Sequence, residues 1–282
     1  MDFSSTSVRD RTQVRDRSIP VPLFILVLIS SVLLLLVGGS LFFFPEVARP
    51  RWVWTLTPFN TRFLGAIYLT ALVGFSLLLL TRKAIPARLI VLMTWVFTTV
   101  VLIVSCLQID QFDVTRRTTH IWFWLYAADC LGSSYYLWHY GKQRLPALRR
   151  LPRPWMVYLQ VQAGFLGVYG LGLLAFPARF GLFWPWPLDT FHSQLYSAIF
   201  LVGAMGAALL AWKTAAAELL TFGVIQMALS GFVLSGVWVV DRAVQKIDWS
   251  LFGNWMWLGA FVLLGITGLG MVWQSRQLRR SW

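Results

Sequence analysis

The dominant pattern along the chain is a series of long apolar runs separated by short polar segments. Eight runs predict helices at 20–44, 61–80, 87–107, 119–140, 155–177, 190–212, 216–239 and 251–273. About 20 apolar residues cross a bilayer as a helix, which satisfies its own backbone hydrogen bonds without water. Strands of an outer-membrane barrel would instead alternate over about 10 residues. The pattern therefore predicts an all-α integral membrane protein with eight transmembrane helices.

The first run resembles a signal peptide, because four arginines precede it in the segment 9–17. Its apolar stretch is, however, far longer than the apolar region of a signal peptide, and Pro45-Glu46-Val47 is not a small-residue cleavage site. We therefore expect a retained helix.

Composition agrees with this prediction. The 282 residues are 58% hydrophobic and 12% charged, with a mean hydropathy of +0.67, whereas soluble domains are about 45–50% apolar and about 25% charged. These values exclude a soluble globule, a disordered chain and a secreted disulfide scaffold.

The net charge of +13 indicates membrane topology rather than nucleic-acid binding. If the N-terminus is cytoplasmic, the inner segments carry about twice as many Lys and Arg residues as the outer ones. This bias predicts a multi-pass protein of the plasma membrane with both termini in the cytoplasm. The excess charge also favours contact with anionic lipids, and no soluble basic module is present to bind nucleic acid.

Two blocks of sequence recur along the chain. Phe44-Pro45 recurs 132 residues later as Phe176-Pro177, and the same offset relates Trp52 and Trp54 to two further tryptophans. The segment 122–127 resembles 255–260 at an offset of 133. We interpret these blocks as an internal duplication.

The duplication predicts a domain organisation. Two four-helix units, 20–140 and 155–275, are joined by a basic linker, 141–154, and flanked by cytoplasmic tails at 1–19 and 276–282. Because each unit has an even number of spans, both enter and leave on one side, and the repeats are parallel. We expect two packed bundles related by a pseudo-two-fold axis.

A cluster of Pro and Trp residues follows the first helix of each unit, in 45–58 and 177–187. One interpretation is an aromatic belt at the level of the lipid headgroups, as is common in membrane proteins. The alternative is a paired lid over a cavity between the bundles.

Standard catalytic and nucleotide-binding motifs are absent from the sequence, and we predict no metal site and no cofactor. Cys106 and Cys130 are expected to be buried thiols too far apart for a disulfide. The spacing of Asp189 and His192 would place two metal ligands on one helical face, but Asp189 is equally a good N-cap.

Asp129 is the residue most suggestive of function, because it lies near the middle of the fourth predicted span. A carboxyl group at that depth is costly and is by default a functional hypothesis. The residues we expect to form a ligand site are Asp129, Tyr126, Ser133, Tyr136 and Gln226.

A structural interpretation of Asp129 stays open beside the functional one. The acid would then be neutral and hydrogen-bonded to a neighbouring helix, with candidate partners Thr94, Thr98, Gln162, Gln226 and Ser230. The 133-residue offset places Val262 at the equivalent position of the second unit, so any site that uses the acid is asymmetric.

The segment Thr57–Ala66 (TPFNTRFLGA), with Arg62 and Gly65, resembles small four-helix bacterial membrane proteins of the DoxX-like group and its uncharacterised relatives. The matching stretch covers under a tenth of the chain, and the second unit has Gln194 and Ser197 at the corresponding positions. The resemblance implies a four-helix fold for each unit. It implies nothing about activity, because the members of the group share none.

Three functions are compatible with these observations. The chain binds or carries a small apolar molecule between its two bundles, with Asp129 as the polar contact. Alternatively, it is a structural or accessory subunit that packs against a protein partner in the membrane. A third alternative is a membrane enzyme that acts on a lipid or quinone-like substrate, but no spacing in the sequence demands an acid–base set.

Overall fold

A computed structural model describes residues 18–142 and 150–280 of the chain. The long helices of this part are α1 (Val21–Phe43), α3 (Pro58–Thr81), α4 (Ala84–Leu107), α5 (Arg117–Gly141), α6 (Arg153–Ala175), α8 (Thr190–Trp212), α9 (Ala216–Val244) and α10 (Phe252–Arg280). The short helical elements are α2 (Pro45–Ala48), η1 (Arg49–Arg51), η2 (Ile109–Gln111), α7 (Pro177–Phe180) and η3 (Gly181–Phe183). The described residues contain no β-strand, and the prediction of an all-α protein is confirmed.

Seven of the described helices are long and apolar enough to cross a membrane. The remaining long helix, α5, has 25 residues, but Trp, Tyr, His and Asp side chains lower its hydropathy. The membrane class is therefore supported, and the eighth span remains a prediction. Residues 1–17 of the predicted tail 1–19 and residues 143–149 of the predicted linker 141–154 lie outside the described residues.

Proline determines where the first helix of each half ends. Pro45 and Pro177 lack an amide hydrogen and disfavour the helical conformation in the residue before them. Phe44 and Phe176 accordingly leave the helix with nearly identical dihedral angles, φ −125° and ψ 52° against φ −132° and ψ 57°. Each proline then occupies the first position of a four-residue helix, α2 or α7.

Two helices, α9 and α10, continue by more than one turn past their predicted C-terminal ends. α9 continues to Val244 and ends where Gln245 adopts a left-handed conformation, while the carboxylate of Asp241 accepts hydrogen bonds from the backbone amides of Lys246 and Ile247. α10 continues to Arg280, through the segment predicted as a tail, and Leu278 packs against an apolar cluster there. The hydropathy pattern identified the spans but missed these extensions.

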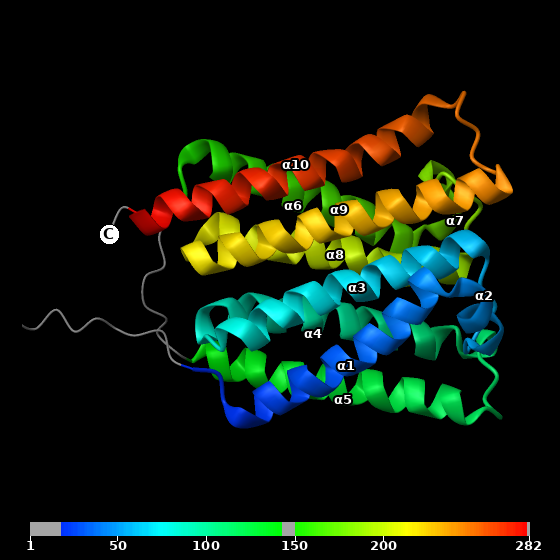
Figure 1. Cartoon of the computed structure of the whole chain (residues 1–282), viewed down its shortest axis with the longest axis horizontal. Helices are drawn as coiled ribbons and strands as arrows, with labels where there is room; N and C mark the ends of the chain where they lie inside the picture. The colour runs from blue at the N-terminus through cyan, green and yellow to red at the C-terminus, as the bar shows by residue number, and fades with distance from the viewer. Residues whose placement is uncertain (1–17, 143–149, 281–282) are drawn as a thin grey trace, which may run out of the picture.

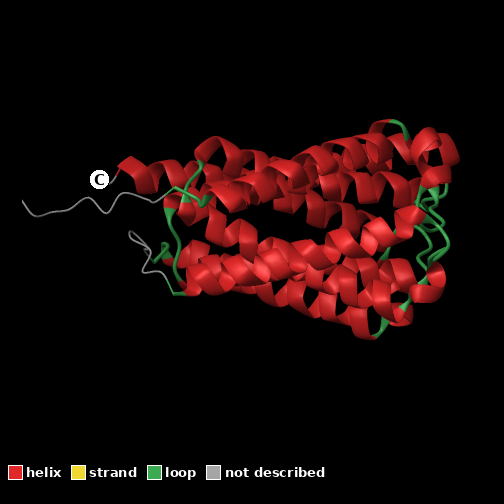
Figure 2. Ribbon diagram, turned by 90° about the horizontal axis from the view of Figure 1, so that it is seen from below, coloured by secondary structure: helices red, strands yellow, loops and turns green. Residues whose placement is uncertain are grey.

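The long helices form two layers. α1, α3, α9 and α10 pack side by side in one layer, and α5, α4, α8 and α6 form the other (Figure 1). Figure 2 shows the layers edge-on. The ends of the described chain lie at one end of the molecule, and α2 and α7 lie at the other. We call these the termini end and the α2–α7 end.

Each layer contains helices from both halves of the sequence. α3 packs against α9 and α4 packs against α8, whereas α3 makes few contacts with α4, its neighbour in sequence. The helices of the first half nevertheless lie together on one side of both layers, and those of the second half lie on the other side (Figure 1). The two halves meet where α3 packs on α9 and α4 packs on α8.

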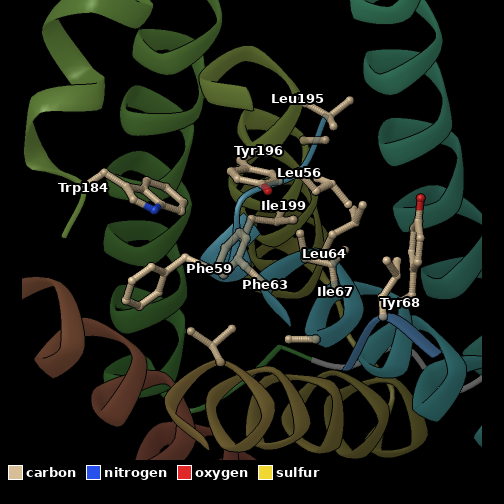
Figure 3. Close-up of a cluster of buried hydrophobic side chains, with 14 of the residues drawn as sticks. Leu56, Phe59, Phe63, Leu64, Ile67, Tyr68, Trp184, Leu195, Tyr196 and Ile199 are labelled. Atoms are coloured by element: carbon tan, nitrogen blue, oxygen red, sulfur yellow. The ribbon is translucent and has the colours of Figure 1, made fainter. Parts of the chain in front are cut away.

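Aromatic side chains fill the interior where α3 and α8 approach one another (Figure 3). Phe63 packs edge-on against Tyr196, with ring centroids 4.8 Å apart, and Trp184 stacks on Tyr196 at 5.6 Å. Trp54, Trp184 and Trp186 are at most 6% exposed. The aromatic-belt interpretation is therefore wrong for these three tryptophans, because their segments fold into the core.

An ion pair joins the two halves near the termini end. The Arg88 guanidinium donates hydrogen bonds to both carboxylate oxygens of Glu218, at 2.8 and 3.0 Å. The Glu218 side chain is fully buried and also accepts a hydrogen bond from the backbone amide of Ala215, at the start of α9. Sequence analysis missed this pair because its members are 130 residues apart.

Candidate functional site

A cavity of about 380 Å³ lies between the two layers and is lined by all eight long helices. Its size is within the range of pockets that hold small molecules, about 300–1,000 Å³. Most of the lining is aliphatic or aromatic. The cavity therefore suits an apolar molecule, and the few polar side chains in its wall define where a polar group could be held.

The predicted site residues are divided between this cavity and a smaller one. Asp129, Tyr126 and Gln226 line the large cavity. Ser133 and Tyr136 line a neighbouring space of about 20 Å³, which Asp129 also borders. The volume of this smaller space is close to that of a single water-sized probe, so Ser133 and Tyr136 lie behind the acid rather than around a ligand.

The polar side chain that interacts with the Asp129 carboxyl group is that of Ser30 of α1, and both residues line the large cavity and the smaller one. This partner was not among the five candidates, and α1 was not one of the helices expected to face the acid. The reason is the layer arrangement, because α5 and α1 occupy the same edge of the two layers (Figure 1). Tyr126, one turn away, shares a hydrogen bond of 3.0 Å with Tyr68 of α3.

The cavity reaches the surface between α1 and α5. Near the termini end these helices are close, since a β-carbon at Gly132 would lie 3.1 Å from Leu26. Toward the α2–α7 end they diverge (Figure 1), and the exposed residues Arg51, Thr118, Ile121 and Leu125 line the cavity there. An apolar molecule could therefore enter sideways from a bilayer.

The opposite end of the cavity is closed and contains two glutamine side chains. Gln162 of α6 is 7% exposed and Gln226 of α9 is 4% exposed. Among the described residues, neither polar atom of the Gln162 amide has a hydrogen-bond partner, and the Gln226 Oε1 atom has none. Sequence analysis named Gln162 only as a partner for Asp129, from which the structure separates it.

Tryptophans at the α2–α7 end form a reciprocal pair of hydrogen bonds between the halves. The Trp54 Nε1 atom donates to the Nε2 atom of His192 at 3.2 Å, and the Trp186 Nε1 atom donates to the Oδ1 atom of Asn60 at 2.9 Å. Trp54 and Trp186 are 132 residues apart, as are Asn60 and His192. Each half thus donates one indole N–H hydrogen bond to the other half and accepts one from it.

His192 is held as a neutral structural residue in this arrangement. Because its Nε2 atom accepts from Trp54, its Nδ1 atom carries the hydrogen and donates to Asp189 at 2.7 Å. Burial alone raises the pKa of Asp189, but hydrogen bonds from the side chain and backbone of His192 outweigh it and lower the pKa below its ordinary value. Asp189 is also the N-cap of α8, as expected.

Metal binding finds no support in the described residues. They contain no group of three His, Cys, Asp or Glu side chains that could hold an ion, and both nitrogens of His192 are already used. The cysteines are free, as predicted, but Cys106 is exposed rather than buried.

A further correspondence corrects the alignment of the fourth helices. The carboxylate of Asp113 accepts hydrogen bonds from the backbone and side chain of Thr115, and Asp248 accepts the same two from Ser250. These positions are 135 residues apart, and not 133.

Tryptophan contacts give the same register. Trp122 contacts Trp54, and Trp257 contacts Trp186. Trp122 therefore corresponds to Trp257, and Asp129 corresponds to Leu264 rather than to Val262.

Comparison of the chain with protein-family models, curated proteins and solved structures finds no match. The fold and the site together define a helical membrane protein with an apolar internal cavity that reaches its lateral surface.

Proposed function

We propose that this chain is an eight-span membrane protein that binds one small apolar molecule between its two layers. The cavity lined by all eight long helices is the observation that carries the proposal. The ligand enters between α1 and α5, and Asp129, linked to Ser30, provides a polar contact near this entrance.

The architecture in this proposal is two parallel four-helix repeats in the plasma membrane, with both termini cytoplasmic. Support comes from the order of elements, which is the same in 21–141 and 153–280 except for the additional η2 of the first half. The reciprocal tryptophan bonds and the matched Asp113 and Asp248 loops give further support. A distant relationship to the DoxX-like group belongs to the same proposal.

Orientation follows from charge. The end of α5, the start of α6 and both ends of the described chain lie at the termini end. The sequence that adjoins these helix ends is rich in Lys and Arg, so we assign that end to the cytoplasm by the positive-inside rule. The opening between α1 and α5 then faces the outer leaflet of the bilayer.

The proposal is tested by native mass spectrometry of the purified chain and two variants of Asp129. Asp129→Asn retains shape and hydrogen bonding, so we expect it to keep the fold and the bound molecule. Asp129→Leu should lose the molecule while its free energy of unfolding stays similar or rises, because a polar group leaves an apolar wall. A wild-type protein that binds no apolar molecule, or an Asp129→Leu variant that binds as the wild type does, would contradict the proposal.

A further inference from the structure

Within the described part of the chain, three polar atoms at the closed end of the cavity lack hydrogen-bond partners: Nε2 and Oε1 of Gln162, and Oε1 of Gln226. Buried polar groups are normally hydrogen-bonded, and leaving one unpaired costs about 1–3 kcal/mol. Both side chains line the cavity. The wall at this end therefore presents unused donor and acceptor capacity to whatever fills the space.

The two amides belong to the same region of the interior. Leu159 and Ala163 of α6 pack in one apolar cluster with Leu219 and Phe222 of α9. Gln162 lies between the first two in sequence, and Gln226 lies one turn beyond Phe222. Both amides therefore lie beside residues of the same apolar cluster.

Charge at this end is absent from the cavity wall. Among the residues that line the cavity, Arg51 of η1 and Asp129 of α5 are the ones that carry a full charge when ionised, and neither belongs to α6 or α9. A carboxylate or phosphate placed beside the amides would be buried without a counter-ion, which is costly. A hydroxyl or carbonyl group would instead satisfy the amides without bringing charge.

We propose that Gln162 and Gln226 form a recognition subsite for a neutral hydroxyl or carbonyl group at the end of an apolar chain. The inference rests on the proposed function and names the chemical class of its ligand. The polar group lies deep between α6 and α9, and the chain extends through the cavity toward the opening between α1 and α5.

Three radiolabelled probes of equal chain length test the subsite: hexadecane, hexadecanol and palmitate. Their binding to the full chain in detergent micelles is measured by scintillation proximity, with empty micelles subtracted. We expect hexadecanol to bind about tenfold more tightly than hexadecane, as one or two added hydrogen bonds would give. Palmitate at neutral pH should bind more weakly than hexadecanol.

The double variant Gln162→Leu/Gln226→Leu should reduce the hexadecanol preference to about onefold and leave hexadecane binding similar or tighter. The matched control is Thr221→Val, which removes a buried polar group of α9 that does not line the cavity, and it should retain the tenfold preference. If the double variant does not fold, the single variant Gln226→Met, of similar side-chain volume, is used instead and should have a smaller preference for hexadecanol over hexadecane than the wild type.

The outcomes separate this inference from the proposed function. If hexadecane and hexadecanol bind equally to the wild type, if palmitate binds best, or if the preference survives in the double variant, the subsite is wrong while binding itself stands. If the wild type binds none of the three probes, the proposed function is wrong and the subsite falls with it.

Discussion

The two halves of the molecule are similar in the hydrogen bonds that join them and different in the side chains that line the cavity. At the α2–α7 end, Trp54 donates to His192 and Trp186 donates to Asn60, so different acceptors perform the same task. In the cavity wall, Ser30 and Gln162 occupy positions 132 residues apart, as do Thr94 and Gln226. Near Ser30 the wall adds an acid, Asp129, whereas near Gln162 the corresponding residue is the apolar Leu264.

This difference shows which part of the molecule is framework and which part is specific. The framework tolerates replacement of Asn by His because both side chains offer an acceptor to an indole N–H group. The cavity has one end that is open and contains an acid, and one end that is closed and contains two amides. An elongated ligand with distinct ends would bind such a cavity in a single orientation.

The largest expected effect on stability concerns the ion pair of Arg88 and Glu218, which has no equivalent at the corresponding positions of the two halves. Arg88→Leu removes the bidentate partner of the buried Glu218, and the positions 132 residues from the pair, Leu220 and Pro86, provide no equivalent ion pair. Losing one member of a buried ion pair should lower the free energy of unfolding by about 3 kcal/mol. Denaturation in mixed micelles measures it.

The double variant Arg88→Leu/Glu218→Leu is the control for this prediction. It should recover much of the loss, because an apolar pair can replace a buried ion pair. A loss below about 1 kcal/mol for the single variant would show that the pair is not buried as described.

A smaller effect is expected from changes at His192 that test the reciprocal bonds. His192→Leu leaves the buried Trp54 N–H group without its acceptor and should cost about 1–3 kcal/mol of unfolding free energy. His192→Asn copies the acceptor that the other half uses and should cost less than His192→Leu by about 1 kcal/mol. Equal losses for the two variants would contradict the proposed equivalence of Asn60 and His192.

The smallest expected effect is the loss of stability at low pH that protonation of Asp189 causes. Its pKa is lower in the folded protein than its ordinary value of about 3.9, so it contributes stability at neutral pH that is lost as the pH falls through the folded pKa. Asp189→Asn should reduce the loss of stability measured by denaturation below about pH 4. The first half has an uncharged N-cap, Thr57, at this position, so Thr57→Ser should leave the acid dependence unchanged.

Hydropathy predicted the helices well because an apolar run of sufficient length has few alternatives to a buried helix. The start of α8 was predicted at its observed residue, and Asp189 was recognised as its cap. The pairing of helices was not predictable, because α3 packs on α9 across the halves rather than on α4. An internal duplication predicts two similar units but not which helices form the contact between them.

The candidate site was predicted in part for the same reason. Asp129 was singled out by its depth, and the structure places it in the cavity wall with Tyr126 and Gln226. Its partner Ser30 was missed because a serine in an apolar helix carries no signal in a single sequence. Gln162 was misassigned, since its role depends on α6 lying at the far edge of the layer from α5.

The central claim is that the space between the layers holds one apolar molecule, and filling that space tests it most directly. Ala71 of α3 lines the cavity, whereas a β-carbon at Gly259 of α10 would meet nothing within 4 Å. Native mass spectrometry of the two variants Ala71→Phe and Gly259→Phe is compared with that of the wild type. The account predicts one bound apolar molecule in the wild type and in Gly259→Phe, and none in Ala71→Phe. Equal occupancy in both variants, or an empty wild type, would contradict it.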